Sequence, residues 1–119
     1  MNKPIVYVVK EQSIRSGETV SMMNYTSAMK YGELVFSTGY DLPAYGRGPA
    51  TEMWQKDVKD FVEAYDPLKD FIVTTGQPAS IFAVGWALGT VKKCPRFLIW
   101  RHESASYVPV HFDGSFMFQ

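Results

Sequence analysis

Short apolar runs alternate with longer segments of helical periodicity along this chain, and this alternation constrains its fold more than any other feature. The runs are too short for helices and rich in β-branched and aromatic residues, which is typical of buried strands. They lie at residues 5–9, 33–37, 71–75, 97–100 and 107–112. Helical spacing is found at residues 52–65 and 78–88. Strands that alternate with helices predict right-handed crossovers and a largely parallel sheet.

The first predicted helix, residues 52–65, has one apolar face. Thr51 precedes it and predicts the N-cap, because a threonine hydroxyl accepts a hydrogen bond from the first turn. Asp66 and Pro67 predict its end, because the residue before a proline is disfavoured in the α conformation. The residues that share a face at helical spacing are expected in the core: Trp54, Val58, Phe61, Val62 and Tyr65.

The second predicted helix, residues 78–88, is apolar nearly all round, with Gly89 as its expected C-terminal cap. A helix of this kind is expected to be buried on several sides. Gly85 in its interior costs about 1 kcal/mol relative to alanine. This cost predicts that another backbone approaches closely at Gly85.

The remaining segments complete the prediction of the fold. Residues 11–19 and 40–50 are expected to be loops, and residues 20–31 suit either a short helix or a turn. Pro109 predicts an edge position for the last strand. The aromatic tail, residues 113–119, is expected to dock on the domain or on a second subunit. We therefore predict one domain over residues 1–119, an α/β three-layer Rossmann-like sandwich whose mainly parallel sheet ends in an antiparallel edge hairpin.

Charge and composition restrict the class of partner. Basic and acidic residues number 12 each, so the formal net charge is zero. Non-specific nucleic-acid binding depends on surplus cations that release phosphate counterions, so nucleic acid is not an expected partner. Cys94 is the single cysteine, which excludes an intramolecular disulfide and is typical of a reducing compartment. No segment has the length of a signal peptide core or of a membrane span, so we expect a cytoplasmic protein with no membrane partner.

A sequence pattern that occurs twice in the chain predicts a ligand site. Two predicted strands end in the same pattern of three apolar residues, a hydroxyl residue, threonine and glycine, at residues 34–39 and 71–76. In a parallel sheet both ends lie at the carboxyl edge, where open α/β sheets bind ligands. A following helix N-terminus offers N–H groups to an anion, and Arg47 in the glycine- and proline-rich loop would reach over it. The predicted ligand-binding residues are Ser37, Thr38, Gly39, Arg47, Thr74, Thr75, Gly76 and Gln77.

The alternative interpretation is that threonine and glycine simply end these strands. The pattern is neither a P-loop nor a dinucleotide-binding glycine motif. No nucleophile motif is present, and Cys94 with His102 and His111 lacks the spacing of zinc ligands. We therefore expect no catalytic residue, no metal and no cofactor.

Several segments resemble a group of small uncharacterised proteins from tailed bacteriophages. They are residues 24–28 (NYTSA), 31–36 (YGELVF) and 75–78 (TGQP), together with Trp100 and residues 107–110 (YVPV). The resemblance covers most of the chain and carries no catalytic motif. It implies a small viral protein that acts in the cytoplasm of the host bacterium.

These observations leave three functional hypotheses in order. The first is a non-enzymatic viral protein that binds a small phosphorylated or nucleotide-like ligand at the carboxyl edge. The second is a protein–protein interaction module that inhibits a host bacterial protein, indicated by the aromatic content of 15%. The third is a small nucleotide-acting enzyme. A homo-oligomer is expected in each case, because short sheets with exposed edges tend to pair.

Overall fold

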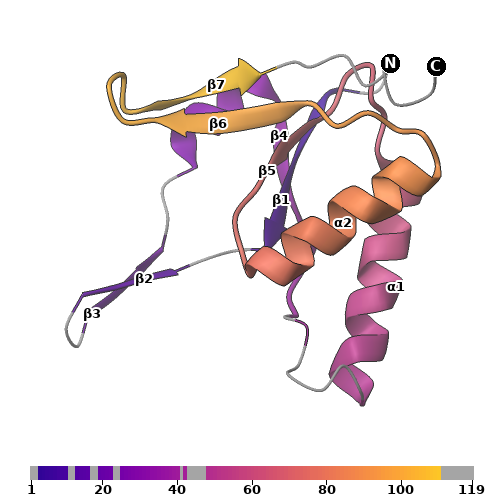
Figure 1. The fold of residues 1–119 in the computed structure, drawn as a ribbon. Coiled ribbons are helices and arrows are strands. Elements are labelled where there is room, and N and C mark those ends of the chain that lie inside the picture. Colours follow the sequence, from indigo (N-terminus) through magenta and orange to yellow (C-terminus); the bar gives the residue numbers. More distant parts are fainter. Residues whose placement is uncertain are drawn as a thin grey trace.

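A five-stranded sheet forms the centre of the molecule, and its strand order is β4-β1-β5-β6-β7. The computed structural model describes residues 3–10, 13–16, 19–22, 25–40, 42 and 48–110 (Figure 1). The strands of this sheet are β1 (Ile5–Lys10), β4 (Glu33–Thr38), β5 (Phe71–Val73), β6 (Phe97–Arg101) and β7 (Ser106–Val110). The pairs β1–β4, β1–β5 and β5–β6 are parallel, and β6–β7 is antiparallel. The predicted parallel sheet with an antiparallel edge hairpin is therefore confirmed.

Three layers enclose two apolar clusters, one on each face of the sheet. The helices α1 (Pro49–Ala64) and α2 (Pro78–Thr90) lie side by side on one face (Figure 1). The 3₁₀ helix η1 (Thr26–Tyr31) covers the other face. Tyr7 and Val9 of β1 point to the helices, whereas Val6 and Val8 point to the η1 side, because successive side chains of a strand alternate between faces.

The order of the strands explains which face each connection occupies. From β1 the chain moves to β4 on one side, and from β4 it crosses back over β1 to β5 and then continues to β6. Right-handed crossovers place the two connections that run in the same direction, through α1 and α2, on the same face. The connection from β1 to β4 runs in the opposite direction and therefore carries η1 on the opposite face.

Helix α1 confirms its predicted buried face but begins earlier than expected. All five residues predicted for the core are buried, and the most exposed of them is Val62 at 8%. The prediction of Thr51 as N-cap was wrong, since the N-cap is Gly48 and Pro49 occupies the first turn. Proline suits that position because its missing N–H would have no helical acceptor.

A buried carboxylate that the sequence pattern did not reveal ties α1 to β1. Asp70 is 1% exposed. Its carboxylate accepts hydrogen bonds from the backbone N–H of Ile5 at 3.0 Å and of Asp66 at 2.8 Å. Nearby, burial raises the pKa of Tyr65 to about 12, and its hydroxyl accepts the Arg96 N–H at 2.9 Å. These contacts fix the C-terminal end of α1 against the starts of β1 and β6.

Helix α2 is less buried than its apolar sequence predicts. Ser80, Val84 and Leu88 are its buried residues, while Phe82 remains 82% exposed and Trp86 70% exposed. The prediction of burial on several sides was therefore wrong, because the described part of the chain places the sheet on one side of α2 and α1 beside it, and leaves the outward side uncovered. The helix also runs to Thr90 with Val91 as C-cap, so Gly89 lies inside it.

Two further predictions about local structure were wrong. Residues 11–19 were expected to be a loop, but β2 (Ser13–Ser16) and β3 (Thr19–Met22) form an antiparallel hairpin that projects from the rest of the molecule (Figure 1). The close backbone approach expected at Gly85 is absent, since a Cβ at that position would meet no atom of the described chain within 4 Å. For residues 20–31 the sequence left open a short helix or a turn. The structure has the end of β3 there, followed by the short helix η1.

The C-terminal hairpin confirms the meaning of Pro109. Strand β7, which contains this proline, is the last strand of the sheet. Proline is tolerated there because an edge strand has one side without ladder hydrogen bonds. His111 and the predicted tail, residues 113–119, lie outside the described residues.

Candidate functional site

Two regions of the molecule are candidates for binding, and the first is the carboxyl edge of the parallel strands. The connections that follow β1 and β5, through η1 and α2, lie on opposite faces of the sheet, so the ends of these two strands form a topological switch point. When the five strands of this sheet are renumbered in chain order, their order in the sheet is 2-1-3-4-5, which is the flavodoxin-like order with β1 in second place. In open α/β sheets, ligands bind outside the carboxyl ends of the strands at such a point.

At this switch point the ends of β1 and β5 are joined directly. The Lys10 backbone N–H donates to the Thr75 carbonyl at 3.1 Å, and the Thr75 hydroxyl donates to the Lys10 carbonyl at 2.9 Å. Gly76 has a φ of +127°, and a Cβ placed on it would lie 3.1 Å from the Lys10 Cβ. The predicted need for glycine at the end of β5 thus has a physical reason, which is the approach of Lys10 and not of a ligand.

The end of β4 is likewise closed by internal hydrogen bonds. The Thr38 hydroxyl is buried, donates to Asp57 Oδ2 of α1 at 3.0 Å and accepts the Tyr40 backbone N–H at 3.1 Å. Gly39 is exposed, and a Cβ there would meet nothing within 4 Å. Ser37 points to the α1 side, where its buried hydroxyl has no partner among the described residues.

Gln77 connects the start of α2 to the chain that leads into α1. Its Oε1 accepts the Leu42 backbone N–H at 2.9 Å, and its Nε2 donates to the Leu42 carbonyl at 3.1 Å. The Ser80 hydroxyl donates to the same Oε1 at 2.9 Å. Both polar atoms of the amide therefore bind the Leu42 backbone, and the side chain does not cap the helix.

The structure brings the predicted residues to one edge of the sheet but not to one point. We name the described ones the carboxyl-edge cluster: Ser37, Thr38, Gly39, Thr74, Thr75, Gly76 and Gln77. Strand β1 lies between β4 and β5, whose ends carry the repeated pattern. Lys10 of β1, paired with Thr38 in register, separates these two strand ends. Sequence reasoning missed Lys10, whose signal was its position directly after the first apolar run, residues 5–9. Arg47 lies outside the described residues.

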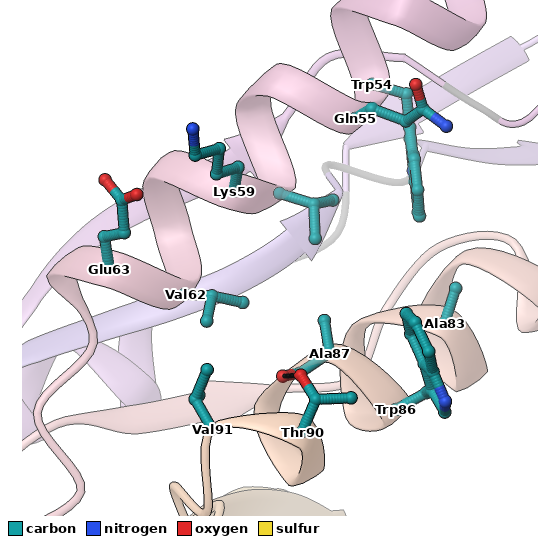
Figure 2. A pocket seen from close by; sticks show the side chains of 11 residues that line it. Trp54, Gln55, Lys59, Val62, Glu63, Ala83, Trp86, Ala87, Thr90 and Val91 are labelled. Atoms are coloured by element: carbon teal, nitrogen blue, oxygen red, sulfur yellow. Dashed lines mark hydrogen bonds between the residues drawn. The ribbon is translucent and has the colours of Figure 1, made fainter.

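The second candidate region is an apolar groove between α1 and α2 with a volume of about 450 Å³ (Figure 2). We name it the helix groove. Its apolar walls are formed by Trp54, Val58, Val62, Ala83, Trp86, Ala87 and Val91. Figure 2 shows Trp54 and Val62 pointing from α1 toward Ala83 and Ala87 of α2, while Lys59 and Glu63 point away along the rim. An apolar floor with a polar, charged rim is the common anatomy of a binding surface.

One polar atom in the wall of the helix groove lacks a partner. Trp54 is 7% exposed, and its Nε1 is buried without an acceptor among the described residues. Buried N–H donors in native proteins are nearly always paired, so each exception requires an explanation. Because Nε1 is enclosed by the protein and is not open to the groove, a molecule in the groove would meet the ring of Trp54 and not this donor. Sequence reasoning missed the helix groove, because the second helix was predicted to be buried on several sides and so to leave no open surface beside the first.

Neither a metal cluster nor a membrane helix occurs in the part of the chain that the structure describes. No group of three or more His, Cys, Asp or Glu side chains comes together within it. None of its helices combines the length and the apolar character needed to cross a bilayer.

Comparison with known proteins supports the resemblance drawn from the sequence. No curated protein and no solved structure matches the chain. A family model does match, that of the Phage Pam3 gp32-like protein, and the match extends over residues 4–114. The expected kinship with small phage proteins is thereby confirmed. The chain belongs to the Phage Pam3 gp32-like protein family.

Proposed function

We propose that this phage protein is a non-enzymatic protein–protein interaction module whose helix groove holds an apolar segment of a host bacterial protein. The single observation that carries the proposal is the apolar groove of about 450 Å³ between α1 and α2, lined by aromatic and aliphatic side chains of both helices. An apolar side chain of the partner would fill the groove and pack on the ring of Trp54. This is the arrangement by which grooves between helices recognise amphipathic segments.

The rim of the helix groove favours a protein over a small apolar molecule. Lys59 and Glu63 carry opposite charges on the exposed side of α1, and Gln55 adds an amide. Charges of both signs around an apolar centre match the mixed surface of a folded partner and fix its orientation. Inhibition of the host protein would follow if the bound segment belonged to its own working surface.

The test is capture of host protein from bacterial lysate, followed by affinity measurement with the purified partner. Ala87→Glu places a carboxylate on the floor of the groove and is expected to weaken binding at least about tenfold. Ala79→Glu is the matched control, because Ala79 is exposed on α2 and does not line the groove. Equal binding by both variants and the unchanged protein would contradict the proposal.

A small anionic or nucleotide-like ligand at the carboxyl edge is the second candidate function. It is favoured by one observation, that α2 begins beside the switch point without a side-chain cap, so the N–H groups of its first turn have no side-chain acceptor. Native mass spectrometry of freshly purified protein would detect a retained ligand. If Thr75→Val and Arg47→Ala both left the affinity for ATP unchanged, this candidate would be excluded. Turnover of a nucleotide, abolished by either substitution, would instead support the third hypothesis, an enzyme.

A further inference from the structure

The outward face of α2 carries a stripe of four residues that alternates large and small. We name it the outer stripe: Phe82, Gly85, Trp86 and Gly89. Their spacing of three, four and seven residues places them on one face of a helix. All four are exposed, and Phe82 and Trp86 are exposed by 82% and 70%. This face is distinct from the helix groove, with Trp86 at the boundary between the two.

No contact among the described residues requires glycine at either of the two glycine positions of the outer stripe. A Cβ at Gly85 or at Gly89 would meet nothing within 4 Å, and neither glycine has a positive φ that would exclude a side chain. Glycine in a helix interior is destabilising relative to alanine. A reason that fits both positions is the approach of a backbone or a large side chain from outside the molecule.

The spacing of the outer stripe is complementary to itself. Consider a second α2 that lies antiparallel across the first, with a two-fold axis between positions 85 and 86. A residue that lies a given number of positions before the axis in one copy then faces the residue that lies the same number of positions after the axis in the other copy. Phe82 then faces Gly89 of the second copy, and Trp86 faces Gly85. A two-fold interface requires that a surface complement itself in this reciprocal way. We propose that a second copy of this chain packs on the outer stripe, with each aromatic side chain seated over a glycine of the other α2.

Charge and area support a second copy as the occupant. Helix α2, residues 78–90 (PASIFAVGWALGT), has no charged residue, so pairing with itself brings no like charges together. Aromatic side chains bury about 150–250 Å² each, so covering the exposed parts of Phe82 and Trp86 removes about 300 Å² per chain from water. Two chains supply about 600 Å² from these side chains alone, half of the roughly 1,200 Å² of a small stable interface.

The first experiment measures the mass in solution by light scattering and sedimentation at micromolar concentration. The unchanged protein is expected at twice the chain mass of 13.5 kDa. Gly85→Leu places a side chain where Trp86 of the second copy would sit, and it is expected to raise the dimer dissociation constant at least about tenfold. The variant keeps its fold, because leucine is a better helix former than glycine and its Cβ meets nothing within the chain. Lys56→Leu, an equal apolar addition at an exposed site on α1, is the control and is expected to remain a dimer.

The second experiment tests the antiparallel arrangement by disulfide cross-linking in a Cys94→Ser background. An equimolar mixture of Phe82→Cys and Gly89→Cys chains is expected to form a covalent mixed dimer on mild oxidation, because these positions face each other across the axis. Each variant alone is expected to cross-link much less. Cross-linking of each variant with its own copy, and not in the mixture, would show a parallel arrangement and overturn the proposal.

The remaining outcomes are also decisive. A monomeric unchanged protein would overturn the proposal, as would a dimer that Gly85→Leu leaves intact. Neither result bears on the helix groove, because the partner capture with Ala87→Glu tests a different face of α2. Conversely, loss of partner binding by Ala87→Glu with the dimer retained would leave both proposals standing.

Discussion

The carboxyl edge of the sheet and the outward side of α2 differ in where their chemical groups find partners. At the carboxyl edge the groups are polar, and Thr38, Thr75 and Gln77 all use their side-chain atoms on other parts of the same chain. On α2 the groups are apolar, and Phe82 and Trp86 have no cover from the chain that the structure describes. Contacts within one chain therefore account for the polar side chains of the carboxyl edge, but they do not account for the apolar side chains on the outward side of α2.

The sequence favours the carboxyl edge as the binding site, whereas the structure favours the outward side of α2. The repeated threonine and glycine suggested a ligand because hydroxyls and close backbone approach are typical of phosphate sites. The same residues serve equally well to fasten β5 to β1, which is what Thr75 and Gly76 do. Exposed aromatic side chains beside unexplained glycines remain as the stronger indication of contact with another molecule.

The largest expected effect on stability comes from Gly76→Ala. The added Cβ lies 3.1 Å from the Lys10 Cβ, and the φ of +127° is one that an alanine rarely adopts. We expect the free energy of unfolding to fall by about 2 kcal/mol. Urea unfolding measures it. A loss below about 0.5 kcal/mol would mean that the ends of β1 and β5 are free to separate and admit a ligand.

Gln77→Ala is expected to have the next largest effect. It removes both hydrogen bonds to the Leu42 backbone and the one from the Ser80 hydroxyl. The expected loss is about 1.5 kcal/mol, because net contributions of exposed and half-buried hydrogen bonds are small. Thr74→Ala, at an exposed neighbouring position, is the control and is expected to stay within about 0.5 kcal/mol. Equal stabilities of the two variants would indicate that Gln77 is available to bind something else.

Gly85→Ala should act in the opposite direction from Gly76→Ala, and this contrast is the sharpest test of the comparison. Nothing in the described chain lies within 4 Å of the new Cβ. In dilute solution, where the chain is monomeric, we expect stability to rise by about 1 kcal/mol, the difference in helix propensity. Thermal or urea unfolding at two protein concentrations separates this gain from any loss of association. A destabilised monomer would show that part of the chain itself covers Gly85.

The sequence predicted the elements that have strong periodicity and missed those that do not. The apolar face of α1, from Trp54 to Tyr65, follows the helical repeat and was found in full. The β2–β3 hairpin escaped notice because residues 13–16 (SIRS) and 19–22 (TVSM) contain too few apolar positions to display an alternation. Thr51 was mistaken for a cap because the proline and glycine before it were assigned to the loop.

The candidate sites were harder to predict because they depend on long-range pairing. Nothing local in Thr75 reveals that its hydroxyl meets a carbonyl 65 positions away, at Lys10. Sequence alone also does not distinguish an apolar helix covered by its own domain from one covered by a second molecule. The exposure of Phe82 and Trp86 shows that the described part of the chain leaves this face of α2 uncovered, and only the arrangement of α2 on the sheet reveals it.

The smallest expected effect is that of Phe82→Ser on the isolated chain, and it is informative because it is small. Phe82 is 82% exposed, so its removal gives up little contact within the monomer, and stability in dilute solution is expected to change by less than about 0.5 kcal/mol. Val84, two residues further along the same helix, is buried, and Val84→Ala is expected to cost several times more. At higher protein concentration the Phe82→Ser chain should lose the association that the unchanged chain shows, since the aromatic ring is what seats over Gly89 of the other copy. A large loss of monomer stability would instead assign Phe82 to the core of its own chain, and the contrast between the paired polar edge and the unpaired apolar helix would disappear.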